Sequence, residues 1–136
     1  LFAYRFTYPL VEYRPRPEWH VQDVVHIPGH EFPHLCVTIA HDLLGNDQCL
    51  LRGELLAIIR IMIDRLESDD FREHRKAPIL LFSFAGPLHS RILHAYYDDG
   101  LVISYTRLYD FTQVNIPDLQ LLMRWAMANP VGNTRI

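Results

Sequence analysis

The sequence predicts an α+β domain in which a central apolar helix packs on a three-stranded antiparallel meander, followed by a C-terminal helix. A long apolar segment with helical periodicity precedes Pro78. Three β-like segments follow it, at about 78–85, 90–97 and 101–109, and helical periodicity returns after Asn115. The length of 136 residues and the hydrophobic fraction of 49% suit one domain with its own core.

The N-terminal residues 1–30 are predicted to form an arm of uncertain structure, ahead of a single domain over 31–136. Pro15 and Pro17 in the segment RPRP (residues 14–17) interrupt any regular element there. Residues 19–27 contain enough valine and isoleucine for a short strand. Because the chain begins with Leu1 rather than methionine, we expect a domain of a longer protein.

Two helices are predicted between the arm and the meander. The first is a short helix over 33–44, where leucine and isoleucine recur at helical spacing. The second is the main helix, which we expect to begin at Asn46 or Asp47, since either can cap it, and to end at about Leu66. Apolar side chains cover about 240° of its circumference, so we expect it to be buried on most sides.

Glu54 lies within the apolar surface of the main helix, between Ile58 and Ile61 on its circumference. A carboxylate in such a setting needs a hydrogen-bonding or charged partner, or it takes up a proton. Two interpretations stay open. Glu54 is either a carboxylate of a functional site, or a residue near the helix start that remains hydrated and interacts favourably with the helix dipole.

The Asp99-Gly100 pair predicts a two-residue hairpin turn between the second and third strands, with Asp98 facing Leu101. This register places six side chains on one face of the hairpin: His94 opposite Tyr105, Tyr96 opposite Ile103, and Ile92 opposite Arg107. From it we predict a binding site formed by His94, Tyr96, Tyr105 and Arg107, which suits an anion or the carboxylate of Glu54. The alternative is a polar patch on a half-buried sheet whose hydrogen bonds are all satisfied.

A zinc site is the weakest hypothesis for this chain. His26, His30 and His34 recur every four residues, a spacing that would place them on one face of a helix. Pro28, Gly29 and Pro33 exclude such a helix, so we expect no metal and no cofactor. The two cysteines form no CxxC motif and are expected to be free thiols in a reducing compartment.

Composition excludes several classes of function. The net charge of −3 gives no general attraction to phosphate, so nucleic acid is not an expected partner. No apolar run approaches the roughly 20 residues of a membrane span, and the N-terminus lacks the pattern of a signal peptide. We therefore expect an intracellular protein, cytoplasmic or nuclear. Nucleophile elbows and phosphate-binding glycine loops are also missing from the sequence.

Two resemblances bear on residues 52–112. RGELLAIIRIM, followed by APILLFSFAGPLHSRILHAYYDDGLVISYTRLYDF, resembles uncharacterised predicted proteins of filamentous fungi, which implies no known activity. The order helix, three strands, helix is also similar to the core of the PD-(D/E)XK nucleases. In that family a helix glutamate, an aspartate near the second strand and an (E/Q)xK motif on the third strand bind a divalent metal and activate water.

This resemblance assigns the helix acid to Glu54. The second strand opens with HSR at residues 89–91, where the family has its aspartate, and the third carries YTR at residues 105–107 in place of (E/Q)xK. The resemblance therefore implies a degenerate member that does not cleave.

The function predicted from these observations is a non-catalytic binding or protein-interaction domain. Its expected partner is a protein, including a second copy of the chain or the rest of a longer chain. The alternative is a divergent or degenerate nuclease-like or hydrolytic enzyme that uses Glu54 with the His94, Tyr105 and Arg107 face.

Overall fold

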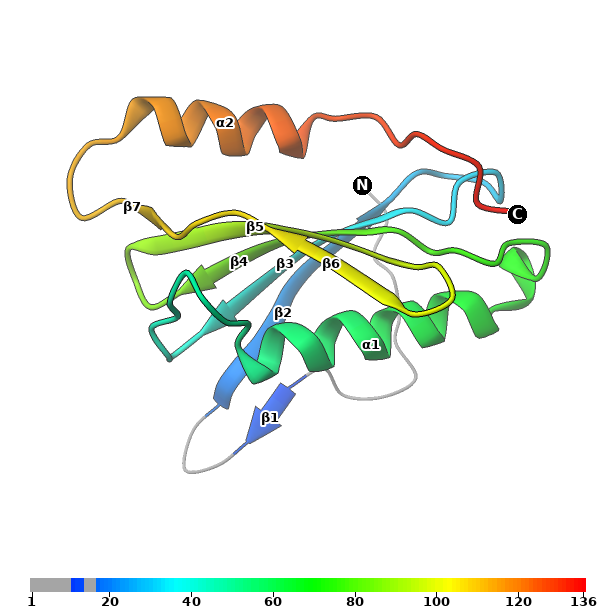
Figure 1. Cartoon of the computed structure of the whole chain (residues 1–136), viewed down its shortest axis with the longest axis horizontal. Coiled ribbons are helices and arrows are strands. Elements are labelled where there is room, and N and C mark those ends of the chain that lie inside the picture. The colour runs from blue at the N-terminus through cyan, green and yellow to red at the C-terminus, as the bar shows by residue number, and fades with distance from the viewer. Residues whose placement is uncertain (1–10, 14–16) are drawn as a thin grey trace.

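A computed structural model describes residues 11–13 and 17–136, and Figure 1 shows two α-helices on opposite faces of one sheet. The sheet has seven strands in the order β1-β2-β3-β4-β5-β6, with β7 also paired to β5. The strands are β1 (Val11–Tyr13), β2 (Pro17–His26), β3 (Leu35–His41), β4 (Ile79–Ala85), β5 (His89–Tyr97), β6 (Leu101–Tyr105) and β7 (Tyr109–Asp110). The helices are α1 (Arg52–Glu67), the short 3-10 helix η1 (Asp69–Phe71) and α2 (Ile116–Ala126).

The predicted three-stranded antiparallel meander is wrong in both size and strand direction. The sheet contains seven strands, and β3 and β4 are parallel, from Leu35 opposite Ile79 to His41 opposite Ala85. Parallel neighbours need a crossover connection, and α1 provides it. The molecule contains both helices and strands, as predicted, but its sheet is mixed rather than antiparallel.

Strand β3 occupies the segment predicted as a helix over 33–44. Buried residues alternate with half-buried ones along it, which is the period of two of a strand. Leu35 and Ile39 are four residues apart, a spacing that fits both a strand and a helix, so the apolar pattern alone was misleading. The β-branched residues Val37 and Thr38 favour the strand.

Strand β2 lies in the region predicted as an arm, and it is an inner strand of the sheet between β1 and β3. Its Trp19 is 2% exposed and belongs to the main core. α1 approaches this indole so closely that a Cβ at Gly53 would lie 2.6 Å from Trp19 Cγ. Residues 1–10 and 14–16 of the predicted arm lie outside the described residues.

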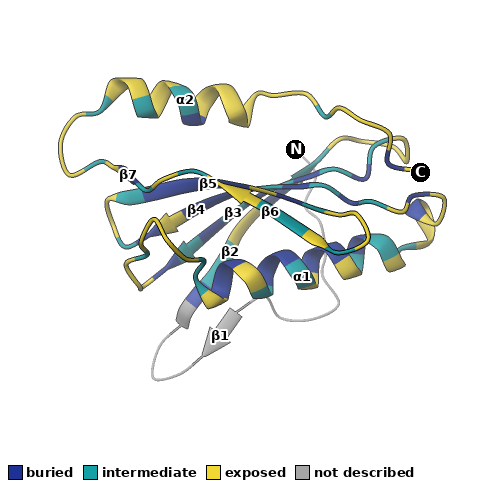
Figure 2. Ribbon diagram, in the orientation of Figure 1, coloured by how far each residue is buried: buried dark blue, intermediate teal, exposed yellow. Residues whose placement is uncertain are grey.

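The main core lies between α1 and one face of the sheet. Ile58 and Ile61 of α1 are fully buried there, against apolar side chains of β3, β4 and β5. A smaller cluster on the other face contains Phe82, Ile92 and Leu122, the last of these on α2. Figure 2 shows the resulting contrast, because the inward side of α1 is buried whereas most of α2 is exposed.

The hairpin between β5 and β6 has a register that differs by one residue from the predicted one. Tyr97 pairs with Leu101, so three residues, 98–100, form the turn. Asp99 and Gly100 do have positive φ angles of 53° and 151°. However, Asp98 donates its backbone N–H to the Gly100 carbonyl instead of pairing with Leu101.

This shift changes which side chains share a face, because neighbours along a strand point to opposite sides. His94 pairs with Ser104, and Tyr105 pairs with Leu93. His94 and Tyr105 therefore lie on opposite faces of the sheet, and the predicted pairs of His94 with Tyr105, Tyr96 with Ile103, and Ile92 with Arg107 are wrong. The predicted strand over 101–109 is also interrupted, since β6 ends at Tyr105 and β7 begins at Tyr109.

Candidate functional site

Glu54 is fully buried in the first turn of α1, and its carboxylate accepts four hydrogen bonds. Ser83 Oγ and Arg91 Nε donate to Oε1 over 2.6 Å and 2.9 Å. Arg91 Nη2 and the Leu51 amide donate to Oε2, the latter over 2.8 Å. A carboxylate offers about four acceptor positions, so these donors leave none for a metal or a substrate.

Arg91 is as fully buried as its partner. Besides the two bonds to Glu54, its guanidinium donates to the carbonyls of Asn46 and Cys49 over 2.8 Å and 3.0 Å. The Tyr105 ring centre lies 5.2 Å from the guanidinium carbon. One arginine on β5 thus joins the start of α1 to the loop that precedes it.

His41 extends this buried network on β3. The Ser83 hydroxyl gives its proton to Glu54, so its oxygen accepts a bond from His41 Nε2 over 3.1 Å. Burial lowers the pKa of His41 to about 4, and the nearby Arg91 charge acts in the same direction while Glu54 opposes it. The ring is therefore neutral near pH 7.

The chemistry of this His-Ser-Glu arrangement differs from that of a hydrolase triad. In a triad the serine donates to the histidine, which then acts as base, whereas Ser83 donates to the carboxylate. Ser83 and Glu54 are both 0% exposed, so a substrate cannot reach either of them. The arrangement holds α1 to β3, β4 and β5.

The structure does not bring Glu54 together with the predicted His94 and Arg107. Glu54 lies on the α1 side of the sheet, whereas His94 lies on the α2 side and lines a different cavity. Arg107 bonds both carboxylate oxygens of Asp118, at the start of α2, over 3.0 Å. Tyr105 lies on the α1 side, where its hydroxyl donates to the Gln48 carbonyl over 3.3 Å.

The side-chain partners of Glu54 are Arg91 and Ser83, neither of which was predicted from the sequence. Ser83 is the single polar residue of β4, and Arg91 is a charged residue of β5 with apolar residues directly after it. That pattern was a usable signal, because a buried acid on a helix needs donors from the strands that cover it.

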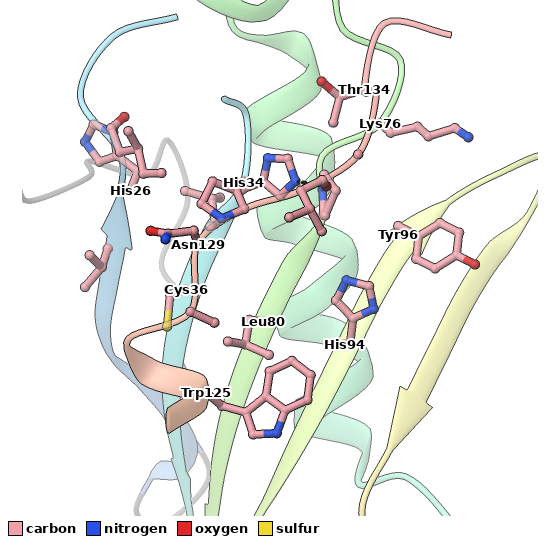
Figure 3. A pocket seen from close by; sticks show the side chains of 18 of the residues that line it. His26, His34, Cys36, Lys76, Leu80, His94, Tyr96, Trp125, Asn129 and Thr134 are labelled. Carbon is pink, nitrogen blue, oxygen red and sulfur yellow. Dashed lines mark hydrogen bonds between the residues drawn. The ribbon is translucent and has the colours of Figure 1, made fainter. Parts of the chain in front are cut away.

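A second site lies on the opposite face, where a cleft of about 460 Å³ separates the sheet from the end of α2 and the C-terminal segment 127–134. Figure 3 shows Cys36, Leu80 and His94 from the sheet and Trp125 from α2 around it. Tyr96, from the predicted binding site, also lines this cleft. Its walls are mainly apolar.

The predicted zinc candidates do not meet. His26 and His34 line the cleft, whereas the His30 ring lies outside it, with Nδ1 3.7 Å from an Asp70 oxygen. Within residues 17–136, no group of three or more histidine, cysteine or acidic side chains is placed to hold a metal ion.

Three ionisable groups that line the cleft, His34, His94 and Cys36, are uncharged near neutral pH. Burial lowers the pKa of His34 and of His94. His34 Nε2 donates to the Val131 carbonyl over 3.1 Å, and its buried Nδ1 has no partner among the described residues, so a second ring proton would find no acceptor. Burial, with a smaller contribution from Asp23, raises the pKa of the Cys36 thiol to about 11.

The C-terminal segment that covers the cleft is anchored at Thr134, which is 6% exposed. Its carbonyl accepts from the amides of Arg75 and Lys76 over 2.8 Å and 3.1 Å. Its hydroxyl lies 2.7 Å from His74 Nδ1, and His74 Nε2 donates to the His30 carbonyl over 3.0 Å. These bonds attach the C-terminal segment to the residues that precede β3 and β4.

Comparisons with known proteins found no matching family model, no matching curated protein and no matching solved structure. None of the helices described here has the length and apolar character needed to cross a membrane.

Proposed function

We propose that this chain is a non-catalytic binding domain that holds an uncharged, largely apolar small molecule in the cleft between the sheet and α2. The observation that carries this proposal is the cleft itself. Its volume of about 460 Å³ falls in the range of small-molecule sites, about 300–1,000 Å³. Such sites combine apolar walls with a few polar groups that orient the ligand.

The electrostatics of the cleft support an uncharged ligand. His34, His94 and Cys36 are neutral near pH 7, because burial lowers the pKa of each histidine and raises the pKa of the thiol. The cationic group at the rim, Lys76, is 2.9 Å from the carboxylate of Asp98. An ionic ligand would lose its hydration without gaining an unpaired opposite charge.

The residues that line the cleft can contact a ligand through apolar surface and through hydrogen bonds. Leu80 and Trp125 offer apolar and aromatic surface. The rings of His94 and Tyr96 lie 5.6 Å apart and present a neutral imidazole and a phenol. Both can donate or accept a hydrogen bond, which suits a ligand hydroxyl, carbonyl or amide.

A binding role fits the other face of the sheet as well. The buried Glu54 carboxylate accepts hydrogen bonds from Arg91 and Ser83, and Arg91 also donates to a backbone carbonyl. These residues stabilise the fold at the start of α1 instead of facing a substrate.

The test is a titration with N-phenyl-1-naphthylamine, an uncharged apolar dye, followed by fluorescence. Leu80→Trp adds bulk at the floor of the cleft, and we expect it to weaken dye binding by about tenfold or more, because overpacking removes the space. Phe84→Trp is the matched control, since Phe84 lies on the same strand and the same face but outside the cleft.

Equal dye affinity for wild-type protein and Leu80→Trp, with both folded by circular dichroism, would refute the cleft as the ligand site. So would an equal loss of affinity in the Phe84→Trp control.

A further inference from the structure

The outer edge of β6 carries unpaired backbone groups. The Thr106 amide donates to Ile92 of β5 over 3.0 Å, and N–H directions alternate along a strand. The backbone groups of Leu101, Ile103 and Tyr105 therefore point away from β5. β6 is the last strand of the sheet path, and no described residue pairs with this edge.

This edge lacks the features that usually prevent strand pairing. Natural edge strands carry lysine, proline or inward-pointing charges, whereas β6 has the sequence LVISY. Leu101 and Tyr105 are 37% and 39% exposed on one of its faces. Figure 1 shows α1 and α2 over the two faces of the sheet, so that neither helix covers the edge.

We propose that the partner of this edge is a second copy of the chain, paired through antiparallel β6 strands about a twofold axis at Ile103. In this register Ile103 lies opposite its own copy, and Leu101 lies opposite Tyr105 of the second copy. Every outward backbone group of β6 then gains a partner. The two sheets would become one continuous sheet, and the association does not involve the ligand cleft.

The charges at the two ends of β6 are complementary in the same register. Asp99 in the turn before β6 lies opposite Arg107, which follows β6, in the second copy. Both side chains are exposed, and the Arg107 side chain remains 58% exposed while it bonds Asp118. The twofold axis produces this contact twice, and opposite charges in facing positions stabilise strand pairing.

Two measurements test the pairing. Sedimentation equilibrium of the wild-type protein should show a concentration-dependent species with twice the chain mass of 16.0 kDa. Cross-linking then tests the register. Val102 lies opposite Ser104 of the second copy as a non-hydrogen-bonded pair with Cα atoms about 4.5 Å apart, which is within reach of a disulfide.

The variants are Val102→Cys and Ser104→Cys, each in a Cys49→Ser background that removes the exposed native thiol. Under mild oxidation, an equal mixture of the two should form disulfide-linked dimers. Each variant alone should not, because a residue and its own copy are then diagonal neighbours about 7–8 Å apart. A monomer at all concentrations, or a dimer without cross-linking specific to the mixture, would overturn the proposal.

Discussion

At the scale of single residues, the stability of the fold depends on a buried ion pair, and the loss of one member alone is strongly destabilising. Glu54 and Arg91 are both 0% exposed and share two hydrogen bonds. Loss of either partner leaves a charge with no water and no counterion, which is far more destabilising than loss of a surface pair.

Arg91→Met is therefore expected to lower the free energy of unfolding by about 3–5 kcal/mol, measured by urea denaturation. Arg72→Met is the matched control. It removes an ion pair with Asp69 whose side chains are 74% and 82% exposed, and it should lower the free energy by about 1 kcal/mol or less. Similar losses in the two variants would contradict the role assigned to the buried pair.

His41 predicts a pH dependence of stability. Its pKa falls from 6.5 to about 4 on folding. Between these two pH values His41 is therefore protonated in the unfolded chain but neutral in the folded protein. The free energy of unfolding should fall by about 3 kcal/mol as the pH falls from about 6.5 to about 4, and it should then level off. This estimate takes about 1.36 kcal/mol for each unit of the pKa shift.

His41→Gln tests this, because glutamine keeps a donor near Ser83 but does not titrate. Urea denaturation near pH 7 and near pH 4 should give a smaller pH difference for the variant than for wild-type protein. His34 and His94, whose pKa values are also lowered, are present in both proteins and cancel in the comparison. Equal pH differences would show that His41 does not titrate as proposed.

At the scale of elements, packing outweighs local preference where α1 crosses β2. Alanine is favoured over glycine inside a helix by about 1 kcal/mol. A Cβ at position 53, however, would lie 2.6 Å from Trp19 Cγ in the core. The helix can approach the sheet this closely because glycine has no side chain.

Gly53→Ala should therefore lower the melting temperature despite its better helix propensity, since overpacking a core costs about 1–3 kcal/mol. Gly45→Ala is the control, because the nearest atoms to its added Cβ are at ordinary contact distances of 3.6 Å. A higher melting temperature for Gly53→Ala would show that Trp19 moves aside at little cost.

Local signals account for the elements that were predicted correctly. β4 covers Ile79–Ala85 within its predicted range, and α1 ends at Glu67, next to the predicted end. α2 begins where the sequence indicates a cap, since the Asn115 side chain accepts from the Asp118 amide over 3.3 Å. The start of α1 at Arg52 came later than predicted, because Asn46 caps a turn and accepts from the amides of Gln48 and Cys49.

At the scale of the whole molecule, the two faces of the sheet have different roles. The α1 face carries the main core and the satisfied network around Glu54. The α2 face is covered less completely, with Leu122 as the single buried residue among those of α2. This incomplete cover leaves room for the cleft, to which we assign the ligand, while the free edge of β6 is left for the second copy.

The sequence by itself determined the helical and strand character of most segments after Gly45, because periodicity, caps and turn residues act over a few neighbours. It also placed Glu54 within the apolar surface of the main helix. Only the tertiary structure decided that Arg91, 37 residues away, is the partner of Glu54, and that β3 pairs in parallel with β4. It also decided that residues between 25 and 134 line one cleft. These outcomes depend on which distant surfaces are buried together, and local pattern does not specify that choice.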